Sequence, residues 1–148
     1  MRDRLTAATC ATLVAVLTAQ FLLGMGVNLT VHVPHARFDV GSMMAAMRGH
    51  PLLMIHMGIG MLTALLALVA GASAATTGRT GIAVPAVAGL IAVLVAGYGG
   101  LRFLTTGGDA ASFTMASGFI FAYAAYFVEL LALVRMRLRS PSLAIPPG

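Results

Sequence analysis

The sequence predicts an all-α protein, a four-helix transmembrane bundle with up-down-up-down connectivity. Two features indicate this fold: four long apolar runs joined by short connectors, and charged residues largely confined to those connectors and to the chain ends. Hydrophobic residues make up 59% of the 148 residues and charged residues only 9%. Because a helix needs roughly 20 apolar residues to cross the hydrocarbon core of a bilayer, each run is long enough to span it. We expect the spanning helices at about 5–31, 51–75, 81–101 and 110–135.

The arginines indicate the orientation of the bundle. The net charge of +5 rests on nine arginines without any lysine, and their position at helix ends favours topology signals over nucleic-acid binding. With four crossings, six of them fall on one side: Arg2, Arg4, Arg79, Arg135, Arg137 and Arg139. By the positive-inside rule this side is cytoplasmic, so we expect a multi-pass plasma-membrane protein with both termini in the cytoplasm. Residues 1–139 would form one transmembrane domain, and residues 140–148 a disordered cytoplasmic tail.

The first helix, about 5–31, carries alanine at every fourth position: Ala7, Ala11, Ala15 and Ala19. A stripe of small residues lets another helix approach closely, which is how helices pack in lipid. Further along, Gln20 and Asn28 place polar amides on one face of the helix. These amides are expected to hydrogen-bond across helices, or to line a polar path from the outer mouth of the bundle.

A short amphipathic helix, about 40–48, is expected in the first outer loop. Asp39 is a suitable N-cap for it. Apolar residues follow at the i, i+3, i+4 and i+7 positions: Val40, Met43, Met44 and Met47. Gly49 and Pro51 then end the segment. Such a helix would lie on the outer membrane surface or over the mouth of the bundle.

The second spanning helix, about 51–75, places a histidine inside the membrane. The small residues of this helix share one face: Gly60, Ala64, Ala67 and Gly71. His56 lies one turn before Gly60 on that face, so it is expected to point into the bundle. An imidazole buried in hydrocarbon is costly without a partner, which makes His56 the most informative histidine of the chain.

The third helix, about 81–101, repeats the small-residue spacing with Ala88, Ala92, Ala96 and Gly100. The fourth, about 110–135, is uncharged except for Glu129 near its end. That carboxylate is expected to snorkel toward the surface or to pair with an inner arginine: Arg4, Arg79 or Arg135. The stripes predict a compact bundle in the lipid bilayer, and a homodimer or another membrane-protein partner if one stripe faces outward.

A candidate site lies in the outer half, where all four histidines fall: His32, His35, His50 and His56. Glycines also concentrate there, so this half has either unusually close helices or room for a flat ligand. Haem b held by His56, with Gly60 below it, would use that room. The second axial ligand would be His32, His35, His50 or Met54, and the function would be electron transfer or haem handling. Alternatively, His56 hydrogen-bonds a polar residue of another helix and the glycines serve packing.

Copper is a second cofactor that would suit this region. His32 and His35 supply imidazoles, and nearby methionines supply soft ligands for Cu(I): Met43, Met44, Met47 and Met54. A third interpretation is a non-catalytic partner or scaffold subunit that associates through its small-residue stripes. The sequence has no phosphate-binding loop and no nucleophile–base arrangement, so it predicts no particular enzymatic reaction.

Several short motifs resemble a family of small four-pass bacterial membrane proteins of uncharacterised function. They are Gln20–Asn28 running into Val33-Pro34, His56–Gly60, Gly99–Leu104, Gly108–Ser112 and Met115-Ala116. This resemblance implies the four-helix membrane fold, and the expected location is then a bacterial inner membrane. More distantly, the plan is similar to four-helix b-type cytochromes and to the half-bundles of haem A synthases, whose haem ligands are histidines on helices. Here only His56 lies well inside a helix.

Overall fold

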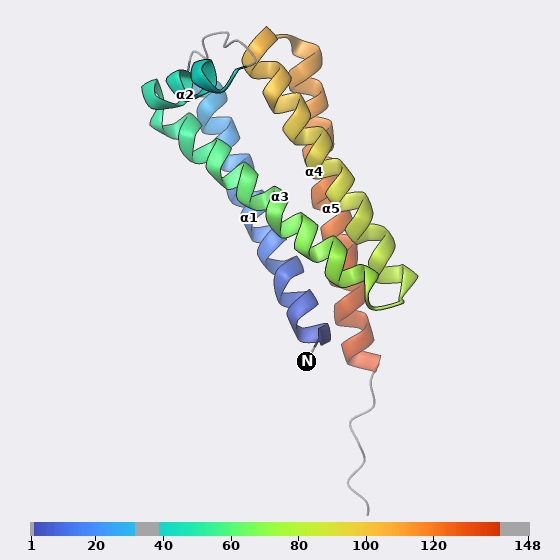
Figure 1. Ribbon diagram of the computed structural model, residues 1–148. Helices are drawn as coiled ribbons and strands as arrows, with labels where there is room; N and C mark the ends of the chain where they lie inside the picture. Colours follow the sequence, from blue (N-terminus) through green and yellow to red (C-terminus); the bar gives the residue numbers. More distant parts are fainter. Residues whose placement is uncertain (1, 32–38, 140–148) are drawn as a thin grey trace, which may run out of the picture.

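The computed structural model describes residues 2–31 and 39–139, and within these ranges the chain is helical without any strand. The helices are α1 (Arg2–Thr30), α2 (Val40–Gly49), α3 (Pro51–Ala75), α4 (Thr80–Thr106) and α5 (Asp109–Arg139). Four of them, α1, α3, α4 and α5, are long and apolar enough to cross a membrane. The predicted all-α fold is therefore confirmed, and the chain is a small multi-pass membrane protein (Figure 1). The tail expected at 140–148 lies outside the described residues.

The helix ends follow from the residues found there. As predicted, Asp39 caps α2: its carboxylate accepts hydrogen bonds from the Ser42 amide at 2.8 Å and from the Ser42 hydroxyl at 2.7 Å. These bonds hold the pKa of Asp39 below its ordinary value, because they favour the ionised form. Pro51 opens α3, where its missing N–H is not needed. α4 continues a turn past its predicted end to Thr106 and stops at Gly107, which adopts the left-handed conformation with φ 61°.

The four spanning helices form a ring in which each contacts two neighbours. α1 packs against α3 and α5, α3 packs against α4, and the most extensive contact joins α4 to α5. Among the described residues, the backbones of the diagonal pairs α1–α4 and α3–α5 do not approach each other closely. Successive spanning helices run in opposite directions, so the start of α1 and the end of α5 lie together, and α2 lies at the opposite end (Figure 1). We call these the terminal end and the α2 end.

α4 and α5 approach closely because glycines replace larger residues at their contact. A Cβ atom added to Gly118 of α5 would lie 2.5 Å from the backbone nitrogen of Ala96 and 2.8 Å from the carbonyl oxygen of Ala92. On α4, a Cβ at Gly99 would collide with the backbone of Met115. Real Cβ atoms essentially never come so near other atoms. At this pair of helices the glycines therefore serve close packing and do not leave room for a ligand.

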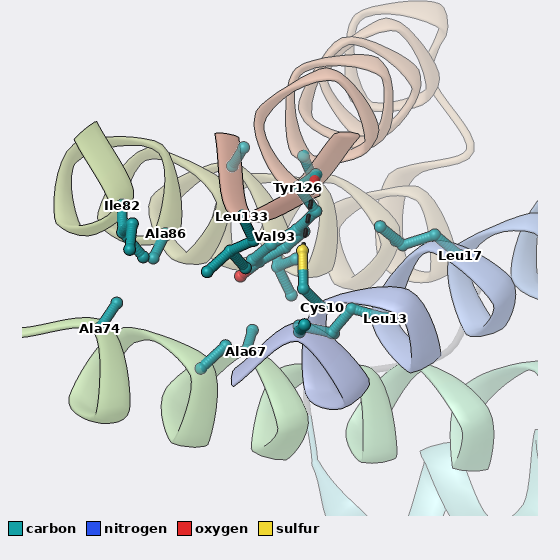
Figure 2. Packing of buried hydrophobic residues seen from close by; sticks show 14 residues of the cluster. Cys10, Leu13, Leu17, Ala67, Ala74, Ile82, Ala86, Val93, Tyr126 and Leu133 are labelled. Carbon is teal, nitrogen blue, oxygen red and sulfur yellow. Dashed lines mark hydrogen bonds between the residues drawn. The ribbon is translucent and has the colours of Figure 1, made fainter. Parts of the chain in front are cut away.

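The main core lies in the half of the bundle nearer the terminal end, and all four spanning helices contribute to it (Figure 2). Its largest fully buried side chains are Tyr126, Leu13, Ile82, Leu133, Glu129 and Cys10. A smaller apolar cluster lies toward the α2 end: Val27, Leu53 and Leu104. Outside these clusters every spanning helix exposes large apolar side chains, including Leu22, Met61, Ile91 and Phe121. These surfaces contact the lipid bilayer.

The small-residue stripes do not all face the same way. In α3, Ala67 is completely buried inside the bundle. In α1, Ala7 is buried, but Ala11, Ala15 and Ala19 are exposed. A step of four residues turns a helix by about 400°, so a stripe with this spacing drifts around the helix axis. The α1 stripe thus begins inside the bundle and ends on its outer surface.

Candidate functional site

A polar contact joins α1 to α3 in the half of the bundle toward the α2 end. The side-chain amide of Gln20 donates a hydrogen bond to the backbone carbonyl of His56, with an N···O distance of 3.0 Å. The same amide nitrogen lies 3.4 Å from Nε2 of the His56 ring. An amide carries two N–H groups, so Gln20 can serve both acceptors when the histidine proton is on Nδ1. The prediction that His56 points into the bundle agrees with this geometry.

Two glycines make room for this contact. A Cβ atom on Gly24 of α1 would lie 3.1 Å from Cε1 of His56, and one on Gly60 of α3 would lie 3.1 Å from Nε2 of Gln20. The His56 ring therefore packs on Gly24, and the Gln20 amide packs on Gly60. The position beside Gly60, where a haem was expected, is filled by Gln20. The described residues form the interhelical contact that is the alternative role of His56, and haem b binding at His56 remains a prediction.

The contact leaves two polar atoms unsatisfied. Nδ1 of His56 and Oε1 of Gln20 are buried without a hydrogen-bond partner. When Nε2 accepts from Gln20, Nδ1 carries the ring proton and has no acceptor for it. Orphaned buried groups of this kind are uncommon in folded proteins, which distinguishes this contact from an ordinary interhelical hydrogen bond.

The other predicted ligands do not gather around His56. Met54 is exposed, and because it precedes His56 by two residues it faces about 200° away around α3. His50 is half-buried at the junction where α2 ends and α3 begins. Asn28 is exposed, so it does not extend the polar contact of Gln20. His32 and His35 lie outside the described residues.

The copper prediction combines histidines that lie outside the described residues with methionines of α2 and α3. Across residues 2–31 and 39–139, no three side chains among His, Cys, Asp and Glu come together as metal ligands. On α2, Met44 is exposed and Met43 and Met47 are half-buried. Part of the apolar side of α2 is therefore exposed, and the predicted copper site would depend on residues 32–38, which lie outside the described residues.

A second polar cluster lies near the terminal end, between α1 and α5. The Cys10 thiol donates a hydrogen bond to the backbone carbonyl of Tyr126 at 3.0 Å (Figure 2). The Tyr126 ring packs on α4, where a Cβ atom added to Gly89 would lie 2.7 Å from it. The Tyr126 hydroxyl and both carboxylate oxygens of Glu129 are buried without a hydrogen-bond partner. Cys10 and Tyr126 are also close enough to Glu129 to interact with it electrostatically.

The position of Glu129 corrects the sequence prediction. Its side chain is 0% exposed, so it does not snorkel, and neither oxygen accepts a hydrogen bond from Arg4, Arg79 or Arg135. The reason is the helical spacing of α5, where the buried residues follow at i, i+4, i+7 and i+11: Ala122, Tyr126, Glu129 and Leu133. This face packs into the core, so Glu129 turns away from the arginines at the membrane surface. Nearness to arginines in the sequence could not reveal this, but the spacing of apolar residues in α5 could have.

The two polar clusters are separate. Cys10 and Gln20 both lie on α1, ten residues and therefore about 15 Å apart along the helix. Between them, Leu13 is 0% and Leu17 is 3% exposed, and both belong to the main core. An apolar layer thus lies between the Gln20–His56 contact and the Cys10–Tyr126–Glu129 cluster, and the bundle has no continuous polar path along α1.

Comparison with known proteins identifies no relative. No protein-family model matches the chain, no curated protein matches it, and no solved structure matches it. The resemblance to b-type cytochromes and haem A synthases therefore has no support from these comparisons. The four-helix membrane architecture rests on the structure of the chain itself.

Proposed function

We propose that the protein is a non-catalytic membrane subunit that associates with a second copy of itself through the exposed face of α1. One observation carries this proposal: Ala11, Ala15 and Ala19 form a small-residue stripe on the outer surface of the bundle. By contrast, Ala67 of α3 is buried inside the bundle, and Gly89, Gly99 and Gly118 serve close packing within it. The α1 stripe has no internal neighbour to pack against.

The physics of helix packing in lipid supports this assignment. Lipid tails are as apolar as leucine, so transmembrane helices associate by close van der Waals contact, which small residues permit. A flat alanine surface can meet an identical surface across a two-fold axis, since each copy then offers the other the same shape. The distribution of arginines supports a plasma-membrane location with both termini in the cytoplasm.

Cysteine cross-linking in native membranes tests the proposal. Ala15→Cys would place a thiol in the centre of the stripe, and Ala124→Cys would place one on the exposed surface of α5 as a matched control. We expect oxidation to give disulfide-linked dimers for Ala15→Cys and not for Ala124→Cys. Ala15→Phe, examined by light scattering in mild detergent, should shift the mass from dimer to monomer. Equal cross-linking of the two cysteine variants would contradict the proposal.

The two cofactor predictions lead to different results in the same preparation. A haem at His56 would give the purified protein a Soret absorption band that is lost in His56→Ala and kept in His50→Ala. Copper at the outer loop would give stoichiometric metal by elemental analysis. Either result would replace the non-catalytic proposal with a cofactor-binding function at the α2 end.

A further inference from the structure

We propose that Glu129 is a proton-binding site inside the bundle, and that it holds its proton while α1 is packed against α5. This inference is independent of the association through α1. It rests on three observations: the side chain is completely buried, both carboxylate oxygens lack a hydrogen-bond partner, and a second unpartnered polar group, the Tyr126 hydroxyl, belongs to the same buried cluster.

Among the side chains that the structure describes, no positively charged group forms a hydrogen bond with the Glu129 carboxylate. From α1, the Cys10 thiol lies close enough to the Glu129 carboxyl group for a weak interaction between the two side chains, but its hydrogen bond of 3.0 Å goes to the Tyr126 carbonyl. A neutral thiol brings no positive charge. The α3 and α4 residues that enter the same core are uncharged: Ala67, Ala70, Ala74, Ile82, Ala86, Ala92 and Val93. The arginines near the terminal end with described side chains are exposed: Arg4, Arg79 and Arg135. None of these arginines donates to Glu129, since neither of its oxygens has a partner.

These surroundings favour the neutral acid over the carboxylate. An ionised carboxylate that leaves water without gaining a partner is strongly destabilised, and the usual outcome is that the group takes up a proton. A metal cation is a poorer solution, because Ca²⁺ and Mg²⁺ require six or more oxygen ligands. Among the described residues no such group of acidic side chains exists. A proton, by contrast, can bind to a carboxyl oxygen of Glu129 without any further ligand.

Proton binding is thereby coupled to helix packing. Loss of the proton converts the carboxyl group into a carboxylate and releases H⁺ to water, leaving an uncompensated negative charge in the core. That charge can be stabilised only if water enters between α1 and α5 or if the helices separate. Leu13 and Leu17 close the route toward the α2 end, so the proton exchanges with water at the terminal end.

A hydrophobic carbodiimide tests the protonation state directly in the full-length protein. Dicyclohexylcarbodiimide reacts with a protonated carboxyl group in apolar surroundings, whose O–H adds across a C=N bond of the reagent. We expect one reagent mass added per chain at neutral pH, mapped by peptide mass spectrometry to Glu129, which is the only glutamate of the chain. The label should be lost in Glu129→Gln and kept in Asp109→Asn, which changes an exposed carboxylate at the start of α5.

Infrared spectroscopy provides a second measurement that does not depend on reagent access. The wild-type protein should show the carbonyl stretch of a protonated carboxylic acid at neutral pH, and this band should shift in D₂O and disappear at high pH. The band should be absent from Glu129→Gln and present in Asp109→Asn. If the variant does not fold, the D₂O shift and the pH dependence of the wild type still decide the matter. A wild-type spectrum without the band at neutral pH would overturn the proposal.

Discussion

Glycine-to-alanine substitution at Gly99 should separate α4 from α5. A Cβ atom at this position would lie 2.8 Å from the Cα atom of Met115, whereas ordinary van der Waals contact begins at 3.4 Å. The backbone nitrogen of Met115 would lie nearer still, so the two helices would have to move apart by more than about 0.6 Å. A gap of roughly 0.5–1 Å forfeits about a quarter to a half of each dispersion contact around it. Overpacking of this kind costs about 1–3 kcal/mol.

Gly97 offers a matched control two residues earlier in the same helix. It is exposed, and a Cβ atom there would meet nothing within 4 Å. Both substitutions bring the same gain in helix propensity, at most about 1 kcal/mol, so the difference between the variants isolates the packing cost. We expect Gly99→Ala to be about 1–3 kcal/mol less stable than Gly97→Ala.

Equilibrium unfolding in mixed micelles of a mild detergent and sodium dodecyl sulfate, followed by circular dichroism, would measure this difference. Adding Met115→Ala to Gly99→Ala should not restore stability, because the collision is with backbone atoms that the truncation leaves in place. Equal stability of Gly99→Ala and Gly97→Ala, or full rescue by Met115→Ala, would refute the close backbone approach of α4 and α5.

Three further substitutions test other contacts. Gln20→Leu removes the hydrogen-bond donor to the His56 carbonyl and should lower the free energy of unfolding by about 0.5–1.5 kcal/mol. Asn28→Leu, at an exposed position, is the control and should change it by less than about 0.5 kcal/mol in the same assay. In Gly89→Ala, the added methyl group would collide with the ring of Tyr126, so the variant should be less stable than the wild type. A lower melting temperature in detergent would show this. The pKa of Asp39 is lowered in the folded state. The stability that its carboxylate gives to α2 is therefore fully present above the ordinary pKa of the group, and it is lost as the pH falls through the lowered value. The protection factor of the Ser42 amide, which is its exchange rate relative to the intrinsic rate at the same pH, should thus be constant above about pH 5 and fall below about pH 4. An unchanged protection factor in Asp39→Ala would contradict the cap.

The spanning helices could be predicted because apolar length alone determines whether a helix can cross a bilayer. The α2 helix was equally predictable, since Asp39 and the apolar residues after it form a local pattern. The roles of the glycines could not be predicted, because they depend on how the helices are rotated against one another. Gly97 and Gly99 are two residues apart in the same apolar run, yet one is open to the surface and the other touches the backbone of α5.

The candidate site shows the same division between local and long-range information. The small-residue face of α3 correctly placed His56 inside the bundle. Its partner, Gln20, could not be identified, because the pairing depends on the register of α1 against α3. For Glu129, proximity to arginines in the sequence is misleading, because the face of α5 on which it lies packs into the core.

The hydrogen bond between Cys10 and Tyr126 joins residues 116 positions apart, so it links the first spanning helix to the last. During synthesis, α1 enters the membrane long before α5 exists, and the ring of helices cannot close until the chain is nearly complete. α4 and α5 are neighbours in sequence and can form their close pair as soon as both are inserted. Membrane assembly should therefore end when α1, which can already pack on α3, meets α5 and closes the ring. A chain stopped before α5 would leave the α5-facing surface of α1, including Cys10, exposed to the membrane quality-control machinery.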